Sequence, residues 1–215
     1  KALNCVHHFF SMNSSVEPSW TLQNPGSFAS IHVKLAPGTA VNCEFDAVVT
    51  ISQGIELRGF ISGGILGALA RIFFTKESFF TTLVENTNTV DPADVMMAPS
   101  EPGGIVLHKL NNDNDDLLLT SGSYVACDTS VRVSSEVQTG IGNSLLSGTG
   151  FFLLRASGSG CVACGAYGSV HKYTLGVGET RLIDNGHLVA WSSSMKYRVG
   201  LAASSNTTMG WTPRL

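Results

Sequence analysis

Charged residues are scarce in this 215-residue chain. Asp, Glu, Lys and Arg make up 13% of it, about half of the ~25% that is usual for a soluble domain. A chain with so few charges has difficulty covering its surface with ionised groups, and the simplest remedy is to bury part of that surface against copies of itself. The net charge is −3, and the basic residues are scattered without a stripe or a stacking platform. Both observations argue against a nucleic-acid partner.

Other absences bear on the compartment and on membranes. The five cysteines are odd in number and the chain is not small, which excludes a disulfide scaffold and favours a reducing, intracellular compartment. No apolar stretch reaches the ~20 residues of a transmembrane helix; the longest, residues 61–74, is shorter and contains Arg71. No signal peptide is visible. The chain begins at Lys1 rather than Met, so the sequence leaves open whether a leader has been removed.

The motifs of common catalytic and cofactor sites are also missing. No glycine-rich stretch ends in the Gly-Lys-Ser/Thr of a phosphate loop, and no Gly-x-Ser-x-Gly elbow occurs. The acidic residues 113–116 lack the spacing of a calcium loop, and the six histidines do not form the cluster of a metal-binding barrel. We therefore predict no enzyme activity, no metal and no cofactor. His187 is the one histidine that we retain as a candidate functional residue. The simpler interpretation is a hydrogen-bonded histidine at the start of a strand.

Cys161-Val-Ala-Cys164 is the most conspicuous pair of reactive residue types. A CxxC pair can be redox active or can supply half of a zinc site. Here it lies in an apolar run typical of a strand, where alternation puts the two thiols on opposite faces. We interpret both as buried thiols that act as small hydrophobic groups.

What the chain does contain is a repeated pattern. Residues 122–133 and 186–197 each begin with glycine, continue with Val-Ala at the same offset, and then carry a small polar run and a basic residue between apolar ones. Residues 46–57 are a fainter copy. A pattern that returns sets the architecture. We expect Gly122 and Gly186 to need positive φ or close backbone approach, so that Gly186→Val would cost ~2 kcal/mol or more.

Short apolar runs separated by turn residues continue along most of the chain, which predicts an all-β fold. Residues 27–35 alternate as a half-buried strand does, residues 36–39 read as a tight turn, and residues 111–116 read as a polar hairpin tip. We divide the chain into an arm at 1–19, a first β module at 20–110 and a second at 111–215, with an incomplete third repeat unit from about residue 175.

Residues 59–74 break the β rhythm. Their apolar positions fall near helical spacing, and Gly63, Gly64 and Gly67 weaken a helix, so we predict a short helical or glycine-rich segment around 61–74. It cannot join a β ladder on this interpretation, and its polar face has too few basic residues for a membrane-surface helix. We therefore expect it to pack in or beside a subunit interface.

An ordered set of short motifs resembles one known family. They are residues 35–38 (Leu-Ala-Pro-Gly), 63–67 (Gly-Gly-Ile-Leu-Gly), 77–80 (Glu-Ser-Phe-Phe), 98–99 (Ala-Pro), 150–154 (Gly-Phe-Phe-Leu-Leu), 166–168 (Ala-Tyr-Gly) and 184–190 (Asp-Asn-Gly-His-Leu-Val-Ala). In this order, from about Trp20 to Val199, the chain resembles the altered-inheritance-of-mitochondria 24 family, also called tryptophan RNA-binding attenuator protein-like. No single motif is specific; the set is.

The resemblance implies a double-stranded β-helix sandwich, duplicated within the chain, assembled as a homotrimer and without known catalysis. RNA and tryptophan binding do not carry over, because the chain shows no basic edge cluster. Fungal members imply a role in mitochondrial membrane organisation and leave room for peripheral membrane contact. The residues that carry the motifs or the repeat are Gly38, Gly63, Gly64, Gly122, Tyr167, Gly186 and His187.

Two hypotheses on function follow. The first is a non-enzymatic, oligomeric β-sandwich protein with a structural or assembly role, intracellular, and mitochondrial in a eukaryotic source or cytoplasmic in a bacterial one. The alternative is a β-barrel protein that binds a small ligand or a metal, since folds of this kind enclose pockets.

Overall fold

The structure is a computed structural model that describes residues 17–26, 28–62, 79–111, 116–136, 153–202 and 210–214. Within these residues all regular structure is β, apart from two 3-10 helices of three residues each. The predicted all-β class is confirmed. Its finer assignment to a double-stranded β-helix stays a prediction.

Fifteen strands follow one another along the described residues. The first seven are β1 (Ser19–Gln23), β2 (Ser30–Leu35), β3 (Ala40–Glu44), β4 (Val48–Ile51), β5 (Ile55–Ser62), β6 (Phe79–Asn86) and β7 (Ala93–Met97). The others are β8 (Gly103–Asn111), β9 (Leu117–Thr120), β10 (Tyr124–Asp128), β11 (Val131–Glu136), β12 (Leu153–Tyr167), β13 (Ala190–Ser192), β14 (Arg198–Ala202) and β15 (Gly210–Arg214). The 3-10 helices are η1 (Ser121–Ser123) and η2 (Asn185–His187). β1 thus begins in the last residue of the predicted arm.

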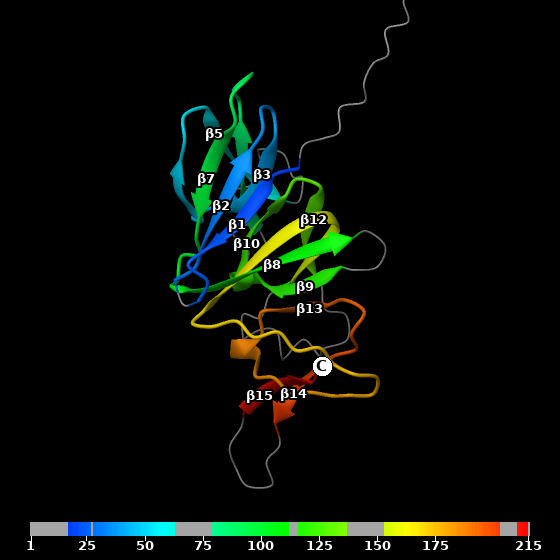
Figure 1. Ribbon diagram of the computed structural model, residues 1–215. Helices are drawn as coiled ribbons and strands as arrows, with labels where there is room; N and C mark the ends of the chain where they lie inside the picture. Colours follow the sequence, from blue (N-terminus) through cyan, green and yellow to red (C-terminus); the bar gives the residue numbers. More distant parts are fainter. Residues whose placement is uncertain are drawn as a thin grey trace, which may run out of the picture.

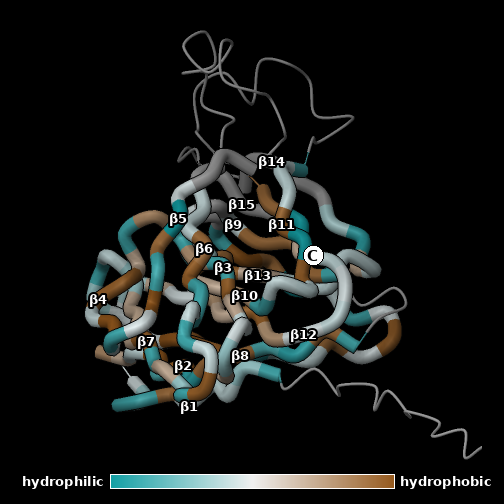
Figure 2. Tube along the Cα trace, turned by 90° about the horizontal axis from the view of Figure 1, so that it is seen from above, coloured by the Kyte–Doolittle hydropathy of each residue, from teal (hydrophilic) through white to brown (hydrophobic). Residues whose placement is uncertain are grey.

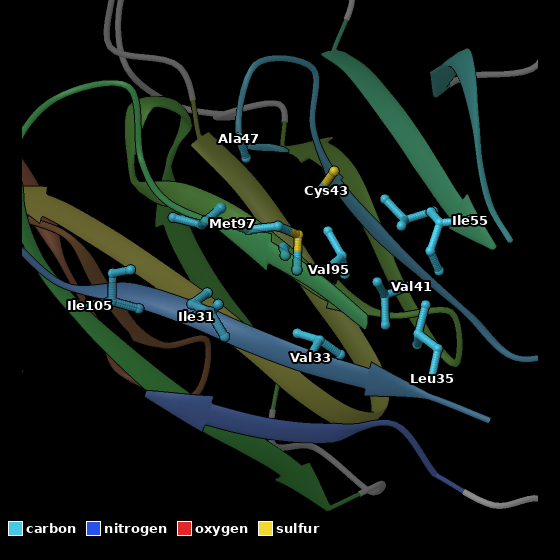
Figure 3. Packing of buried hydrophobic residues seen from close by; sticks show 14 of the residues in the cluster. Ile31, Val33, Leu35, Val41, Cys43, Ala47, Ile55, Val95, Met97 and Ile105 are labelled. Carbon is cyan, nitrogen blue, oxygen red and sulfur yellow. The ribbon is translucent and has the colours of Figure 1, made fainter. Parts of the chain in front are cut away.

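Two sheets form a sandwich in the upper part of Figure 1. One has four strands in the order β1-β2-β7-β4; the other has nine, with β13-β9-β12-β10-β3-β6-β5 as its main path and β8 and β11 paired to β12. β14 and β15 form a separate two-stranded sheet. Side chains of both large sheets meet in one apolar core, in which β2 and β7 face β3, β5 and β6 (Figure 3).

The local sequence explains the strands of this core. In β2 the residues Ile31, Val33 and Leu35 are fully buried, whereas His32 and Lys34 between them are not. This alternation is what a strand with one face on a core requires, and it confirms the predicted half-buried strand. The predicted turn follows it: Thr39 N donates to Ala36 O over 3.0 Å, and Gly38 has a φ of +71°, which suits glycine.

The longest strand, β12, contributes side chains to three apolar cores. Its second half pairs with β8 on one edge and β10 on the other, and its first half pairs with β9 and β11. Thus β8 with β9, and β10 with β11, each act as one long interrupted strand beside β12. A second apolar core forms where β9, β10, β11, the end of β8 and both halves of β12 come together, and a third, smaller one lies around Trp191.

Two glycines lie in the middle of β12, where its pairing passes from β9 and β11 to β8 and β10. Gly158 and Gly160 have φ values of +110° and +142°, which L-residues rarely adopt. Both approach the turn between β10 and β11: a Cβ on Gly158 would lie 2.5 Å from Ser130 O, and one on Gly160 would lie 2.8 Å from Ser130 Oγ. Only residues without a side chain fit at these two points.

Three expectations need correction. β5 extends to Ser62, and Ile61 pairs with Phe80 in a β ladder, so the segment predicted as helical or glycine-rich is a strand at residues 61 and 62; residues 63–78 lie outside the described part. Residues 111–116 do not cap a hairpin, because β8 and β9 on either side both pair with β12 rather than with each other. The reason is that β12 offers the longer apolar partner.

The third correction concerns the repeat glycines. Gly122 and Gly186 lie in η1 and η2 and have no positive φ. A Cβ on Gly122 would meet nothing within 4 Å, and one on Gly186 would meet only the flexible Asp184 carboxylate at 3.1 Å. A short 3-10 turn needs no left-handed residue, so the strain expected for Gly186→Val is wrong. Both glycines do precede a strand, β10 and β13; the internal duplication itself stays a prediction.

Candidate functional site

The most buried acidic side chain of the described residues is Asp128, at the end of β10. Asp128 is 7% exposed. Its Oδ1 accepts a hydrogen bond of 2.8 Å from Trp20 Nε1, and its Oδ2 accepts one of 2.7 Å from the backbone N of Cys161. Three strands therefore meet at one carboxylate: β1, β10 and β12.

The glycine at position 160 of β12 makes this arrangement fit. A Cβ on Gly160 would come within 2.9 Å of both Cβ and Oδ2 of Asp128, so the carboxylate reaches the Cys161 amide only across a glycine. Ser130 Oγ donates to Ser159 O over 2.5 Å and fixes the turn that follows Asp128. A hydrogen bond of the local turn and a glycine on a distant strand thus position the same group.

A shallow cleft of about 240 Å³ opens beside Asp128. It is lined by Glu17, Pro18, Trp20, Leu107, Lys109, Asp128 and Cys161. Lys109 Nζ lies 3.6 Å from Glu17 Oε2, and both side chains are largely exposed, at 64% and 74%. An ion pair this open to water contributes little, so the rim of the cleft is solvated and loosely paired.

The electrostatics of the cleft do not favour covalent chemistry. Burial raises the pKa of Asp128, while the hydrogen bonds from the Cys161 amide and the Trp20 indole act in the opposite direction. Burial also raises the pKa of the Cys161 thiol to about 12, and the nearby Asp128 carboxylate adds to the rise. The nucleophile and metal ligand is the thiolate. At neutral pH Cys161 is therefore a thiol, and Asp128 has both oxygens occupied.

The second cysteine of the CxxC pair lies elsewhere. Cys164 is 3% exposed and belongs to the second core, whereas Cys161 lines the cleft. The two thiols point to opposite faces of β12, as alternation predicts. Burial raises the pKa of Cys164 to about 12 as well. The pair has neither the shared face nor the lowered pKa of a redox or zinc motif.

A second polar cluster surrounds Arg155 on β12. Its Nε and Nη2 donate to Glu136 Oε2 and Oε1 over 2.9 and 2.7 Å, and its Nη1 donates to Asp116 Oδ2 over 3.0 Å. The hydrogen bonds from Arg155 lower the pKa of Glu136. This bidentate pair and the bond to Asp116 connect β11, β12 and the residue before β9. Because all three guanidinium nitrogens donate a hydrogen bond, Arg155 acts as a cross-link.

The structure does not gather the predicted residues into one site. Gly38 is in the turn after β2, and Tyr167 ends β12 with 78% of its surface exposed. In η2, His187 Nδ1 lies 2.9 Å from Asp184 Oδ2, which confirms a hydrogen-bonded histidine at that position; its side chain is 83% exposed. Gly63 and Gly64 fall outside the described residues. None of the five described ones, which include Gly122 and Gly186, lines the cleft.

Sequence reasoning missed Asp128 and Trp20 because 108 positions separate them. One signal was available. Asp128 stands in a run of apolar and small residues where the second copy of the repeat has Ser192, and an acidic residue in a buried strand needs hydrogen-bonding partners.

Two further findings concern metal binding and membrane-spanning helices in the described part. Its residues include no group of three or more His, Cys, Asp and Glu side chains placed to hold a metal ion. The same residues include no helix with the length and apolar character to cross a membrane.

Comparison with known proteins assigns a family. The uncharacterized protein M6_Spy0233 of Streptococcus pyogenes serotype M6 is 29% identical over 189 residues, which cover 85% of this chain and 73% of that protein. The crystal structure of protein SPYM3_0169 from Streptococcus pyogenes is similar with a TM-score of 0.70 and 25% identity, over 92% of this chain and 89% of that one. The sequence profile of Mitochondrial biogenesis AIM24 matches residues 20–213. The predicted resemblance is confirmed, and the chain belongs to the Mitochondrial biogenesis AIM24 family.

Proposed function

We propose that this chain is a non-enzymatic β-sandwich protein that assembles with copies of itself and has a structural role. The observation that carries this proposal is an open side of the sandwich. There, β4 and β5 are the edge strands of the two sheets, and Figure 2 shows them on the same side of the molecule. Ile51 of β4 and Leu57 of β5 are 41% and 46% exposed.

Both residues belong to the core side of their sheets. Ile51 pairs with Val95 and Leu57 pairs with Val84, and both partners are fully buried. Directly paired residues point to the same face of a sheet. The sandwich core therefore continues to its rim and meets water there, instead of ending in polar side chains.

The surroundings of this rim are apolar too. The register of β4 against β7 shifts between Val48 and Thr50, and this bulge leaves Val49 56% exposed. Phe45, just before β4, is 73% exposed. Open edges with apolar side chains associate unless they are covered, and each Å² of apolar surface removed from water stabilises by roughly 25 cal/mol. A second copy of a charge-poor chain is a suitable cover.

Several finer statements belong to the same proposal. The family resemblance supports a double-stranded β-helix sandwich, internal duplication and a threefold assembly. It also supports a role in mitochondrial membrane organisation for a eukaryotic source, with a cytoplasmic location for a bacterial one. The absence of a nucleic-acid partner rests on the scattered basic residues.

Leu57→Lys should shift the assembly toward the monomer, because it places a charge on the rim that association would bury. Light scattering coupled to size exclusion at micromolar concentration measures this. The control is Val177→Lys, at a fully exposed position outside the sandwich, which should leave the mass unchanged. A native protein that is strictly monomeric at all concentrations would overturn the proposal.

The alternative function, binding of a small ligand or a metal, is supported by the cleft beside Asp128. Its volume of about 240 Å³ is below the ~300 Å³ at which ligand pockets begin, which restricts it to a small group. Elemental analysis of the purified protein separates the two functions. Stoichiometric zinc, iron or manganese that is lost in Asp128→Asn, at the cleft, would favour the alternative.

A further inference from the structure

We propose that β5 is the contact strand of this assembly and that it pairs antiparallel with β5 of a second copy about a twofold axis at Leu57. The inference rests on the self-assembly proposed above and names its surface. Among the described residues β5 pairs with β6 alone. Its other edge is solvated: Glu56, Leu57 and Arg58 have exposed fractions of 55%, 46% and 59%.

The backbone of β5 presents the right groups. Gly54 O accepts a hydrogen bond of 2.8 Å from Thr87 N, so residue 54 directs its backbone toward the partner strand β6. Backbone direction alternates along a strand. Glu56 and Arg58 therefore also point their N–H and C=O groups toward β6, while Ile55, Leu57 and Gly59 point theirs toward the open edge.

The side chains select one register. An axis at Leu57 places Glu56 opposite Arg58 of the partner subunit, twice, and these are opposite charges. An axis at Glu56 or at Arg58 would set like charges against each other, which destabilises a ladder. An axis at Ile55 or at Gly59 would leave both charges without a counterpart. The sequence Glu56-Leu57-Arg58 therefore pairs with itself with opposite charges facing each other only when the twofold axis passes through Leu57.

The same register suits the apolar face. Leu57 meets Leu57 of the partner subunit on the core side, which continues the core across the axis. Ile55 meets Gly59 of the partner subunit, and a Cβ on Gly59 would have nothing within 4 Å, so the isoleucine has room. Within one subunit, Arg58 Nη2 serves both Glu56 Oε2 at 3.0 Å and Glu85 Oε2 at 3.2 Å. The pairing places Arg58 of the partner subunit opposite Glu56, so that each Glu56 gains a second guanidinium neighbour.

A twofold contact has a consequence for stoichiometry. It is isologous and joins subunits in pairs, so the assembly contains an even number of chains. If a threefold contact exists as well, the two together give six chains.

Charge exchange tests the contact and its register. Glu56→Arg and Arg58→Glu each place like charges across the axis, and each should weaken the contact at least tenfold in Kd by light scattering across a dilution series. The double variant restores opposite charges and should reassemble. An equimolar mixture of the two single variants should also reassemble, because one then faces the other with complementary charges. Circular dichroism of the dissociated variants checks that they keep the β-sheet spectrum.

Glu179→Arg and Arg181→Glu are the matched controls, since this exposed pair has the same charges at the same spacing outside the ladder of β5. They should leave the assembly unchanged. Single β5 variants that keep the native mass would overturn the β5 contact while self-assembly stands. Dissociation without recovery in the double variant and the mixture would overturn the register. A native monomer would overturn both proposals.

Discussion

At the scale of single residues, the two glycine pairs of this chain have opposite roles. Gly158 and Gly160 on β12 have positive φ and lie against the turn after β10. Gly122 and Gly186, which the repeated pattern brings to notice, have neither property. A glycine is required where backbone geometry or a close neighbour excludes a side chain, and recurrence in the sequence does not report on either.

Gly160→Ala should therefore destabilise the fold by about 3 kcal/mol, through backbone strain together with a clash at Asp128 and Ser130. Urea unfolding followed by tryptophan fluorescence gives the free energy of unfolding. Gly122→Ala is the control and should change it by less than about 0.5 kcal/mol. Equal losses in the two variants would show that the close approach at Gly160 relaxes freely.

At the scale of elements, the bond between Trp20 and Asp128 attaches the edge strand β1 to the opposite sheet. β1 otherwise pairs only with β2 within the described residues. Trp20→Phe keeps an aromatic ring but leaves Asp128 Oδ1 without its donor, and an unsatisfied buried acceptor costs about 1–3 kcal/mol. The free energy of unfolding in urea measures this loss.

Trp191→Phe is a matched control for that prediction. Trp191 is buried, at 4% exposure, whereas Trp20 is partly buried. The Nε1 of Trp191 has no hydrogen-bond partner among the described residues, so the substitution removes ring volume without removing a bond. The loss for Trp20 should exceed the loss for Trp191. The reverse order would mean that the indole hydrogen bond adds nothing to the attachment of β1.

The elements differ in how far sequence predicts them. Ile31, Val33 and Leu35 alternate with polar residues, so β2 and the turn at Gly38 follow from local pattern. The pairing of β8 and β9 with β12 does not, because the choice between a hairpin and a distant strand depends on packing that spans about fifty residues. Trp20 and Asp128 are a further case: neither has a sequence neighbour that indicates the other. Strands and turns that depend on neighbouring residues were therefore predictable here, whereas strand pairing and hydrogen bonds between distant residues were not.

At the scale of the whole molecule, stability should fall as pH rises from about 5 to 8. Burial, with a contribution from Asp46, raises the pKa of Glu44 from 4.5 to about 7, and burial also raises the pKa of Asp128. Between pH 4.5 and 7 the folded chain binds a proton at Glu44 that the unfolded chain has released. Folding is then linked to proton uptake, so removing protons favours unfolding.

Glu44→Gln should flatten this dependence, since the amide stays neutral throughout. Thermal midpoints between pH 5 and pH 8 test it, with Glu179→Gln at an exposed position as the control that keeps the native slope. The same fall in the midpoint for Glu44→Gln and for the native protein would mean that other groups set the pH dependence.

The fifteen residues of β12 also decide how the molecule can come apart. One strand belongs to three cores and pairs with β8, β9, β10 and β11. No core can therefore open its side of β12 without loosening the others. A cut in the chain after β8, between residues 111 and 116, would place β8 and β3 on one fragment and their partners β12 and β10 on the other. Each fragment would then expose the ladder edges that pair with the other. Such fragments are natural partners for reconstitution by mixing, and the intact chain should melt in a single step.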